Sequence, residues 1–237
     1  MSVTLSPDLQ VALPLEAPPP ADFLPVRLLR DGASITQQIL EDREVDALLP
    51  RLLTVSTGAG ALFGLAIGLP GGGAQALVSA VKLPVVLLGA AALGLPALRL
   101  GAALAGRRLR AAQISALLLQ GLATAATTMA ALVPLAVVVW LTASTFSDSD
   151  WYVYRRAVAA FTAVAALGGL VGASRLLRAL PPTAVLGWAG LFGVAGLQLT
   201  WLLRPVVGSP SESLVLLRAL ESNGLAELLR LVGTVLS

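Results

Sequence analysis

Long apolar runs, separated by short polar breaks, dominate this sequence from about residue 52 onward. Each run approaches or exceeds the roughly 20 residues that a helix needs to cross a bilayer core of about 30 Å. We predict five spans from these runs: residues 52–69, 75–98, 113–146, 152–173 and 183–203. The predicted fold class is therefore all-α, a polytopic transmembrane helical bundle that occupies residues 51–204.

The two ends of the chain follow a different pattern. Residues 1–33 hold six prolines, which predicts an extended, disordered leader. Residues 34–50 place apolar side chains at helical spacing after Ser34, a residue type that caps helices. We predict an amphipathic helix here, lying on the membrane surface and ending near Pro50. The tail, residues 205–237, contains two further amphipathic pieces that are too short or too charged to cross, so interfacial helices are expected at both ends.

Prolines, glycines and arginines predict where the spans begin, bend and end. The segment PGGG at residues 70–73 predicts a tight turn between the first two spans. The span 113–146 is longer than a bilayer requires, which predicts a tilt or a break near Pro134. An arginine group that begins at Arg99 predicts a loop or interfacial segment before this span.

Composition and the placement of arginine predict location and orientation. Hydrophobic residues make up 57% of the 237 and charged residues only 12%, which is typical of a membrane protein. With the N-terminus cytoplasmic, ten arginines fall on the inner side and five on the outer side. Rich Ala, Leu, Gly and Arg content is typical of a GC-rich bacterial genome. We therefore predict a multi-pass protein of a bacterial inner membrane, with a cytoplasmic N-terminus and a periplasmic or external C-terminus.

Several kinds of chemistry are excluded by the residues that the chain lacks. It contains no His and no Cys, and none of its 13 acidic residues falls inside a predicted span. Histidine-based catalysis, haem or iron–sulfur ligation and carboxylate proton relays in the membrane therefore have no donors. We expect no enzymatic activity, no catalytic residue, no metal and no cofactor. The basic residues form no continuous stripe with aromatic platforms, so we also expect no nucleic-acid binding.

Three residues are candidate contacts for a ligand or lipid: Lys82, Arg204 and Ser209. Lys82 lies inside the second predicted span, and an ionisable residue there indicates either a solute or headgroup site, or a side chain that reaches the interface or bonds a neighbouring carbonyl. Arg204 and Ser209 follow the last span, in LLRPVVGSP. They indicate either residues that end the helix and turn the chain or an anion-recognition element.

The segment GLQLTWLLRPVVGSP resembles a signature of a poorly characterised family of bacterial polytopic inner-membrane proteins, with the pattern LRPxxGSP after the last span. The matching positions are Gln198, Trp201, Arg204, Pro205, Gly208, Ser209 and Pro210, together with Ser79, Ala80, Lys82 and Pro84 in the second span and Ser222 and Asn223 in the tail. The resemblance covers about residues 50–237 and implies no particular activity. The proline-rich leader departs from the pattern.

Glycine spacing and a polar stripe lead to two functional hypotheses. Rows of glycine in the first and fourth spans, such as Gly64 and Gly68, allow helices to approach closely within one chain or between copies. They favour a non-enzymatic anchor or accessory subunit that binds membrane lipid, other membrane subunits or itself. The rival is a small channel or carrier for a neutral or anionic solute or lipid. It requires a polar face along one helix, which the third span approaches with Gln113, Ser115, Gln120, Thr124, Thr127 and Thr128.

Overall fold

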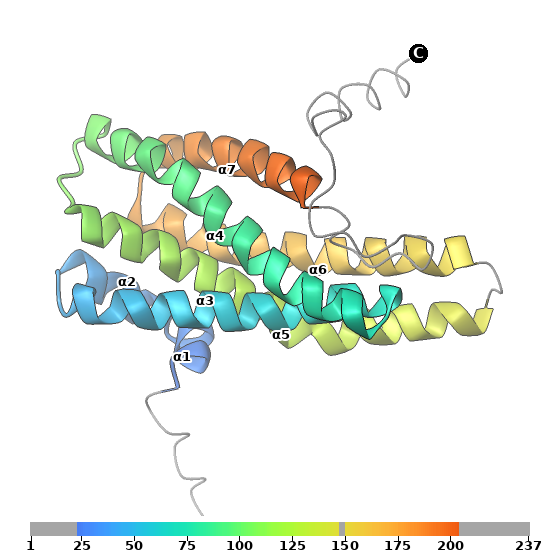
Figure 1. The fold of residues 1–237 in the computed structure, drawn as a ribbon. Helices are drawn as coiled ribbons and strands as arrows, with labels where there is room; N and C mark the ends of the chain where they lie inside the picture. Colours follow the sequence, from blue (N-terminus) through green and yellow to red (C-terminus); the bar gives the residue numbers. More distant parts are fainter. Residues whose placement is uncertain (1–22, 147–149, 204–237) are drawn as a thin grey trace, which may run out of the picture.

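Five long helices form the body of the protein, which a computed structural model describes over residues 23–146 and 150–203. They are α3 (Val45–Gly68), α4 (Gly73–Leu104), α5 (Ala111–Phe146), α6 (Asp150–Ala179) and α7 (Pro182–Leu202). All five are long and apolar enough to cross a membrane, and the described residues contain no strand. The chain is thus a multi-pass, all-α helical bundle, as the apolar runs predicted (Figure 1).

Two short helices precede the bundle, and the first of them corrects the predicted extent of the leader. Helix α1 (Leu24–Arg30) and helix α2 (Gly32–Leu40) occupy part of the segment that the prolines led us to expect as extended. Pro25 stands in the first turn of α1, where its missing N–H would lack a partner anyway. Leu28 is fully buried, which stabilises the helix through tertiary packing. Residues 1–22 lie outside the described part of the chain.

The predicted surface helix 34–50 is two elements in the structure. Helix α2 ends at Leu40, and the chain then reverses through Asp42 and Glu44, both with positive φ (60° and 51°). Helix α3 begins at Val45 and continues through Pro50, which is exposed in the first turns of the helix. Helix α2 is also not a free surface helix: Ile35 and Ile39 are fully buried, because they pack into the core of the bundle.

Helices α3, α4 and α6 extend beyond the predicted spans. Helix α4 continues to Leu104 and includes Arg99, which we expected in a loop or interfacial segment. Helix α5 continues through Pro134 without a break. In lipid, ending a helix leaves its backbone groups without water, so a continuous helix with one missing bond is the less costly solution. The predicted tail, 205–237, lies outside the described residues.

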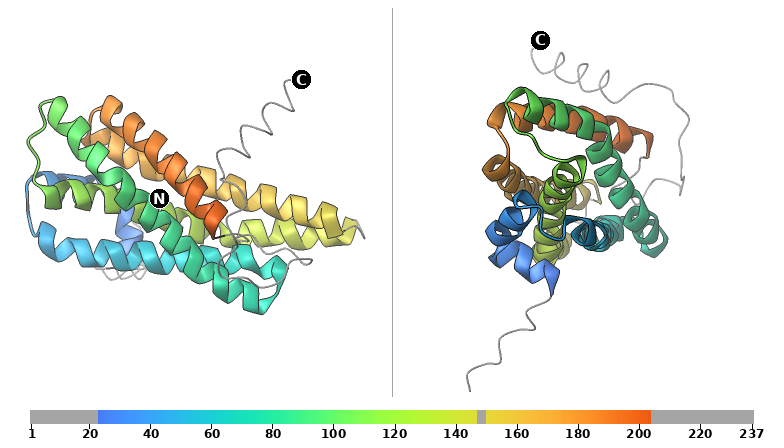
Figure 2. Two further views of the ribbon diagram at one scale, coloured as in Figure 1. Left: turned by 45° about the horizontal axis from the view of Figure 1, so that its top comes forward. Right: turned by 90° about the vertical axis from the view of Figure 1, so that its left-hand side faces the viewer.

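The long helices are arranged in two parts. Helices α3, α5 and α6 lie side by side, while α4 crosses them obliquely (Figure 1). Helix α4 packs against α3 near its start and against α7 over its second half, and this second half lies beside α7 at the top of the right-hand view (Figure 2). Helix α7 makes few contacts with α6 and has the smallest buried share of the five spans. One face of α7 is therefore left uncovered by the described chain.

Glycines sit where these helices approach most closely. A Cβ on Gly68 would lie 2.6 Å from Ala76 Cα of α4, and one on Gly64 would collide with the Ser79 carbonyl. Between α5 and α6, a Cβ on Gly172 would meet the backbone of Gly121 and lie 2.8 Å from Ala125 Cβ. Gly64, Gly68 and Gly172 therefore form contacts inside the protomer, as small residues do in membrane helix pairs, whereas Gly58 and Gly169 of the same rows are open.

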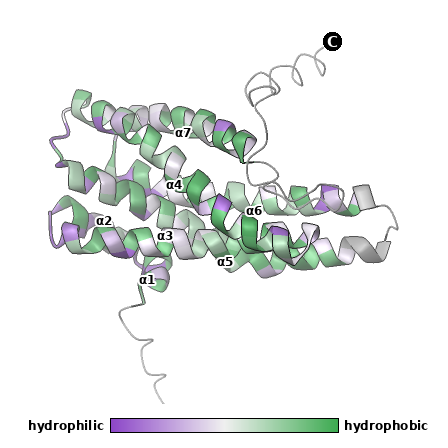
Figure 3. Ribbon diagram, viewed as in Figure 1, coloured by the Kyte–Doolittle hydropathy of each residue, from purple (hydrophilic) through white to green (hydrophobic). Residues whose placement is uncertain are grey.

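Charge gathers at one end of the bundle. The hydrophilic segments lie where α2 and the α4–α5 connection meet, whereas the long helices are mainly apolar between their ends (Figure 3). The larger buried apolar cluster lies nearer this charged end and includes Leu28, Ile35 and Ile39 of the N-terminal helices. The second cluster joins α3, α5 and α6 around Phe63 and Phe161, whose rings meet edge to face with centroids 6.0 Å apart. The N-terminal helices are thus part of the main core.

Candidate functional site

Lys82 is buried inside the bundle, with 4% of its surface exposed. It shares a face of α4 with Gln75 and Ser79, which lie seven and three residues earlier and are buried as well. Gln75 Nε2 donates to Ser79 Oγ across 3.2 Å. Lys82 is therefore part of a buried polar row on α4 and does not extend over the lipid-facing surface.

The other two candidate residues, Arg204 and Ser209, lie outside the described residues, which end at Leu203. Their predicted role as anion contacts stays a prediction. The family resemblance that rests partly on them also stays a prediction.

The polar stripe of α5 holds the N-terminal helices. Gln120 is 1% exposed, and its Nε2 donates to the Gly32 carbonyl at 2.7 Å. The same nitrogen lies 3.0 Å from Thr36 Oγ1, and this hydroxyl is 2.9 Å from the Gly32 carbonyl. Thr36 and Gln120 are both buried, so these hydrogen bonds also satisfy polar groups that would otherwise lack a partner in an apolar interior. Gln120 thus fixes the first turn of α2 against α5.

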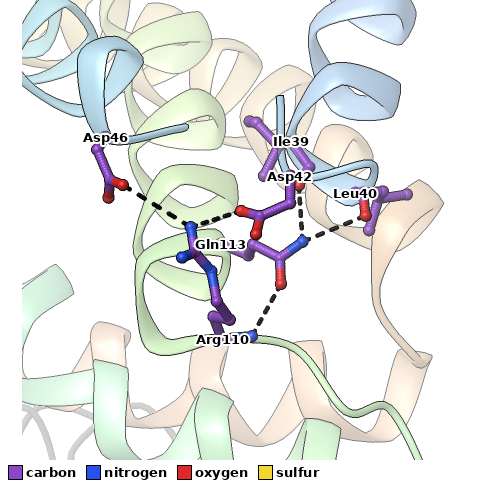
Figure 4. Close-up of polar contacts among 6 residues, drawn as sticks. All are labelled: Ile39, Leu40, Asp42, Asp46, Arg110 and Gln113. Atoms are coloured by element: carbon purple, nitrogen blue, oxygen red, sulfur yellow. Dashed lines mark hydrogen bonds and ion pairs between the residues drawn. The ribbon is translucent and has the colours of Figure 1, made fainter. Parts of the chain in front are cut away.

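Two turns earlier on α5, Gln113 holds the other end of α2. Its Nε2 donates to the carbonyls of Ile39 and Leu40 at 2.9 and 3.2 Å (Figure 4). These carbonyls belong to the last turn of the helix, where the usual donors four residues on are missing; the Ile39 carbonyl also accepts from the Asp42 backbone N–H at 3.1 Å. The Gln113 side-chain oxygen in turn accepts from the Arg110 backbone N–H at 2.8 Å. The seven-residue spacing of Gln113 and Gln120 therefore matches the length of α2.

Helix α6 contributes Arg175 to the same assembly. Its Nη2 lies 3.2 Å from each of the carbonyls of Leu28 and Leu29, at the end of α1. A cation beside these carbonyls is favoured both as a hydrogen-bond donor and by the helix dipole. A Cβ on Gly32 would lie only 2.7 Å from Arg175 Cζ, so glycine leaves the space that the guanidinium fills. We call Gln113, Gln120 and Arg175 the polar seat of the N-terminal helices.

An exposed ion pair closes the outer edge of the seat. Arg110 Nη2 lies 2.6 Å from Asp42 Oδ1 and 3.8 Å from Asp46 Oδ2 (Figure 4). Both partners of the closer pair are solvent-accessible, and such pairs contribute at most about 1 kcal/mol. The buried amide bonds of the seat therefore stabilise the docked helices more than this ion pair does.

The two glutamines of the polar stripe, which the rival channel hypothesis requires as a pathway lining, belong to the seat. Gln113 and Gln120 bind α2, while Thr124 Oγ1 and Thr128 Oγ1 donate to carbonyls of their own helix four residues earlier, at 2.7 and 2.8 Å. Such local bonds satisfy the hydroxyls within the helix. This arrangement counts against a continuous polar face for solute along α5.

Sequence reasoning missed the seat because its partners are far apart in the chain. Arg175 bonds backbone atoms 146 and 147 residues away, whereas from the sequence it was only one of the ten arginines counted on the inner side. The available signal was the spacing of Gln113 and Gln120, which places two long amides on one face of an otherwise apolar helix.

The surface between α1 and α2 bears a shallow depression of about 750 Å³ with charges of both signs on its rim, including Arg27, Arg43 and Glu44. Arg43 pairs with Glu41 at 2.7 Å across exposed side chains. The mixture of charges selects no particular ion.

No known protein family, curated protein or solved structure matches this chain.

Proposed function

We propose that this protein is a non-enzymatic anchor or accessory subunit of a bacterial inner-membrane complex, and that α7 is the helix that binds the partner. The observation that carries the proposal is the open face of α7. A Cβ built on Gly187, Gly190 or Gly193 meets no atom within 4 Å, and Leu186 and Leu191 beside them are exposed. Small residues flanked by leucine let a second membrane helix approach closely.

The placement of arginine supports a cytoplasmic N-terminus. The end of the bundle that carries α2 and the α4–α5 connection also holds most of the described arginines. They precede or begin α3, end α4 and α6, or lie between α4 and α5: Arg43, Arg51, Arg99, Arg107, Arg108, Arg110, Arg175 and Arg178. Arg155 and Arg156 are near the start of α6, at the opposite end. Positive charge is retained on the cytoplasmic side during insertion, so the crowded end is proposed to be the inner one.

A small carrier for an anionic solute is the second candidate, favoured by the buried Lys82 in α4. The engagement of Gln113 and Gln120 by α2 weakens it, since a carrier of this kind needs free polar groups along its path. Solute flux in proteoliposomes that changes with Lys82→Ala would favour this alternative over the anchor.

Purification of the tagged protein from its native membrane in a mild detergent tests the anchor proposal. We expect a stoichiometric membrane partner with the native chain and its loss with Gly190→Leu, because the added side chain fills the open face of α7. Gly169→Leu is the matched control, since its Cβ on α6 is also free of contacts within 4 Å. A lone, monodisperse protein, or a partner that both variants retain alike, would contradict binding through α7.

A further inference from the structure

An apolar crevice of about 480 Å³ opens between α1, α3 and α5. Its walls include Phe23, Val26 and Leu29 of α1, Gly58 and Leu62 of α3, and Thr127 of α5. The volume lies within the range of about 300–1,000 Å³ that is usual for ligand sites. The crevice exists because small residues form its floor: a Cβ on Gly58 would meet no atom within 4 Å.

One buried polar group in the crevice has no partner among the described residues. Thr127 is 9% exposed, and its Oγ1 makes no hydrogen bond. Its neighbours Thr124 and Thr128 both bond a carbonyl of the preceding turn, so the lack of a bond is particular to Thr127. A buried hydroxyl without a partner costs about 1–3 kcal/mol, which an acceptor on a bound molecule would offset.

Two arginines lie beyond the crevice on the same helical faces. Arg51 precedes Val55, Gly58 and Leu62 on α3 by four, seven and eleven residues, all of which recur on one side of a helix. Arg30 follows Phe23 and Val26 on α1 by seven and four residues. Both arginines are exposed, and neither forms an ion pair within the described ranges. Each arginine therefore lies about one turn from a crevice residue of its own helix, Arg51 from Val55 and Arg30 from Val26.

The distance along α3 agrees with the depth of a lipid. Gly58 lies about 10 Å from Arg51 along the helix axis, at about 1.5 Å per residue. One leaflet of the hydrocarbon core is about 15 Å thick, half of the whole core. A headgroup at the level of Arg51 therefore places its acyl chain at the level of Gly58.

We propose that the crevice holds one acyl chain of an anionic membrane phospholipid, with the headgroup phosphate against Arg30 and Arg51. The apolar walls exclude a polar solute, and the two unpaired cations complement a phosphate. An ester carbonyl at the head of the acyl chain is the acceptor for Thr127 Oγ1. The site is independent of the open face of α7, so a failure of one proposal leaves the other standing.

A titration of the delipidated full-length protein tests this site. Dioleoylphosphatidylglycerol and, separately, dioleoylphosphatidylcholine are added in detergent, and bound lipid is counted by native mass spectrometry. We expect Gly58→Leu to weaken binding of the first phosphatidylglycerol molecule at least tenfold, because the leucine side chain occupies the crevice. Arg51→Gln should weaken phosphatidylglycerol about tenfold, as loss of a charged hydrogen bond predicts, and phosphatidylcholine less, because its choline cation already opposes the attraction of its phosphate to arginine. Gly169→Leu and Arg107→Gln change residues away from the crevice. Their affinity for phosphatidylglycerol should stay within about twofold of that of the native chain.

A second crevice variant distinguishes loss of lipid binding from misfolding. Ala131→Leu narrows the crevice from α5 and should reproduce the effect of Gly58→Leu, with melting in detergent confirming that both variants fold. Native affinity in both crevice variants would overturn the proposal. So would equal affinity of the native chain for the two lipids, or binding that arises only after residues 1–22 are deleted, which would make that segment the occupant.

Discussion

Replacing Gly172 by valine is expected to destabilise the bundle by about 3 kcal/mol or more, the upper range for overpacking a tight contact. The added Cβ would meet the backbone of Gly121 and lie 2.8 Å from Ala125 Cβ. Neither a carbonyl of the facing helix nor a Cβ can rotate away, so α5 and α6 must separate. Thermal melting in a mild detergent, followed by the fraction of protein that stays monodisperse, measures the effect.

Gly169→Val on the same helix is the control for this substitution. It has the same change in side-chain volume and helix propensity, but its Cβ position is open within 4 Å. We expect its melting temperature to stay close to that of the native chain. Equal destabilisation by both variants would show that helix propensity, and not the contact of α5 with α6, decides the result.

Replacing Gln120 by leucine is expected to release the N-terminal helices at a cost of about 2 kcal/mol. Leucine keeps the bulk of the side chain but removes the donor to the Gly32 carbonyl and leaves Thr36 without its partner on α5. The five long helices do not depend on this bond, so we expect them to stay folded. Limited proteolysis should therefore cut between α1 and α3 faster, while the protease-resistant core keeps its size.

Gln37→Leu provides the comparison for Gln120→Leu. Gln37 is an exposed residue of α2 whose side chain bonds only Glu41, at 2.8 Å. Cleavage of this variant should proceed at the native rate. If the native chain and Gln120→Leu were cut equally fast, the buried amide would contribute nothing to docking.

The sequence was most informative about the spans, because a helix in lipid must satisfy its own backbone and be apolar over a fixed length. It was less informative about where the helices end. Pro50 and Pro134 are compatible with a continuing helix, and Arg99 extends α4 beyond the apolar run. Charge and proline predict the edge of the membrane more reliably than the end of a helix.

The N-terminal helices could not be predicted as docked elements. Helix α1 has seven residues, too few to be stable alone, and it forms because Leu28 packs into the core and Arg175 binds its last carbonyls. Those contacts join residues about 147 positions apart, which no local pattern reveals. For the same reason a stripe of glutamine and threonine was open to interpretation as a solute path.

Hydrogen–deuterium exchange of the full-length protein in lipid nanodiscs tests the central claim, that the polar seat of α5 and α6 holds α1 and α2 on the bundle. Amides of Ile35 to Leu40 should exchange as slowly as those of the long helices, since buried, bonded segments open only rarely. Gln120→Leu should accelerate exchange in α1 and α2 and leave the five long helices at the native rate. Rapid exchange of α2 in the native chain, at the rate of an unprotected peptide, would contradict the account.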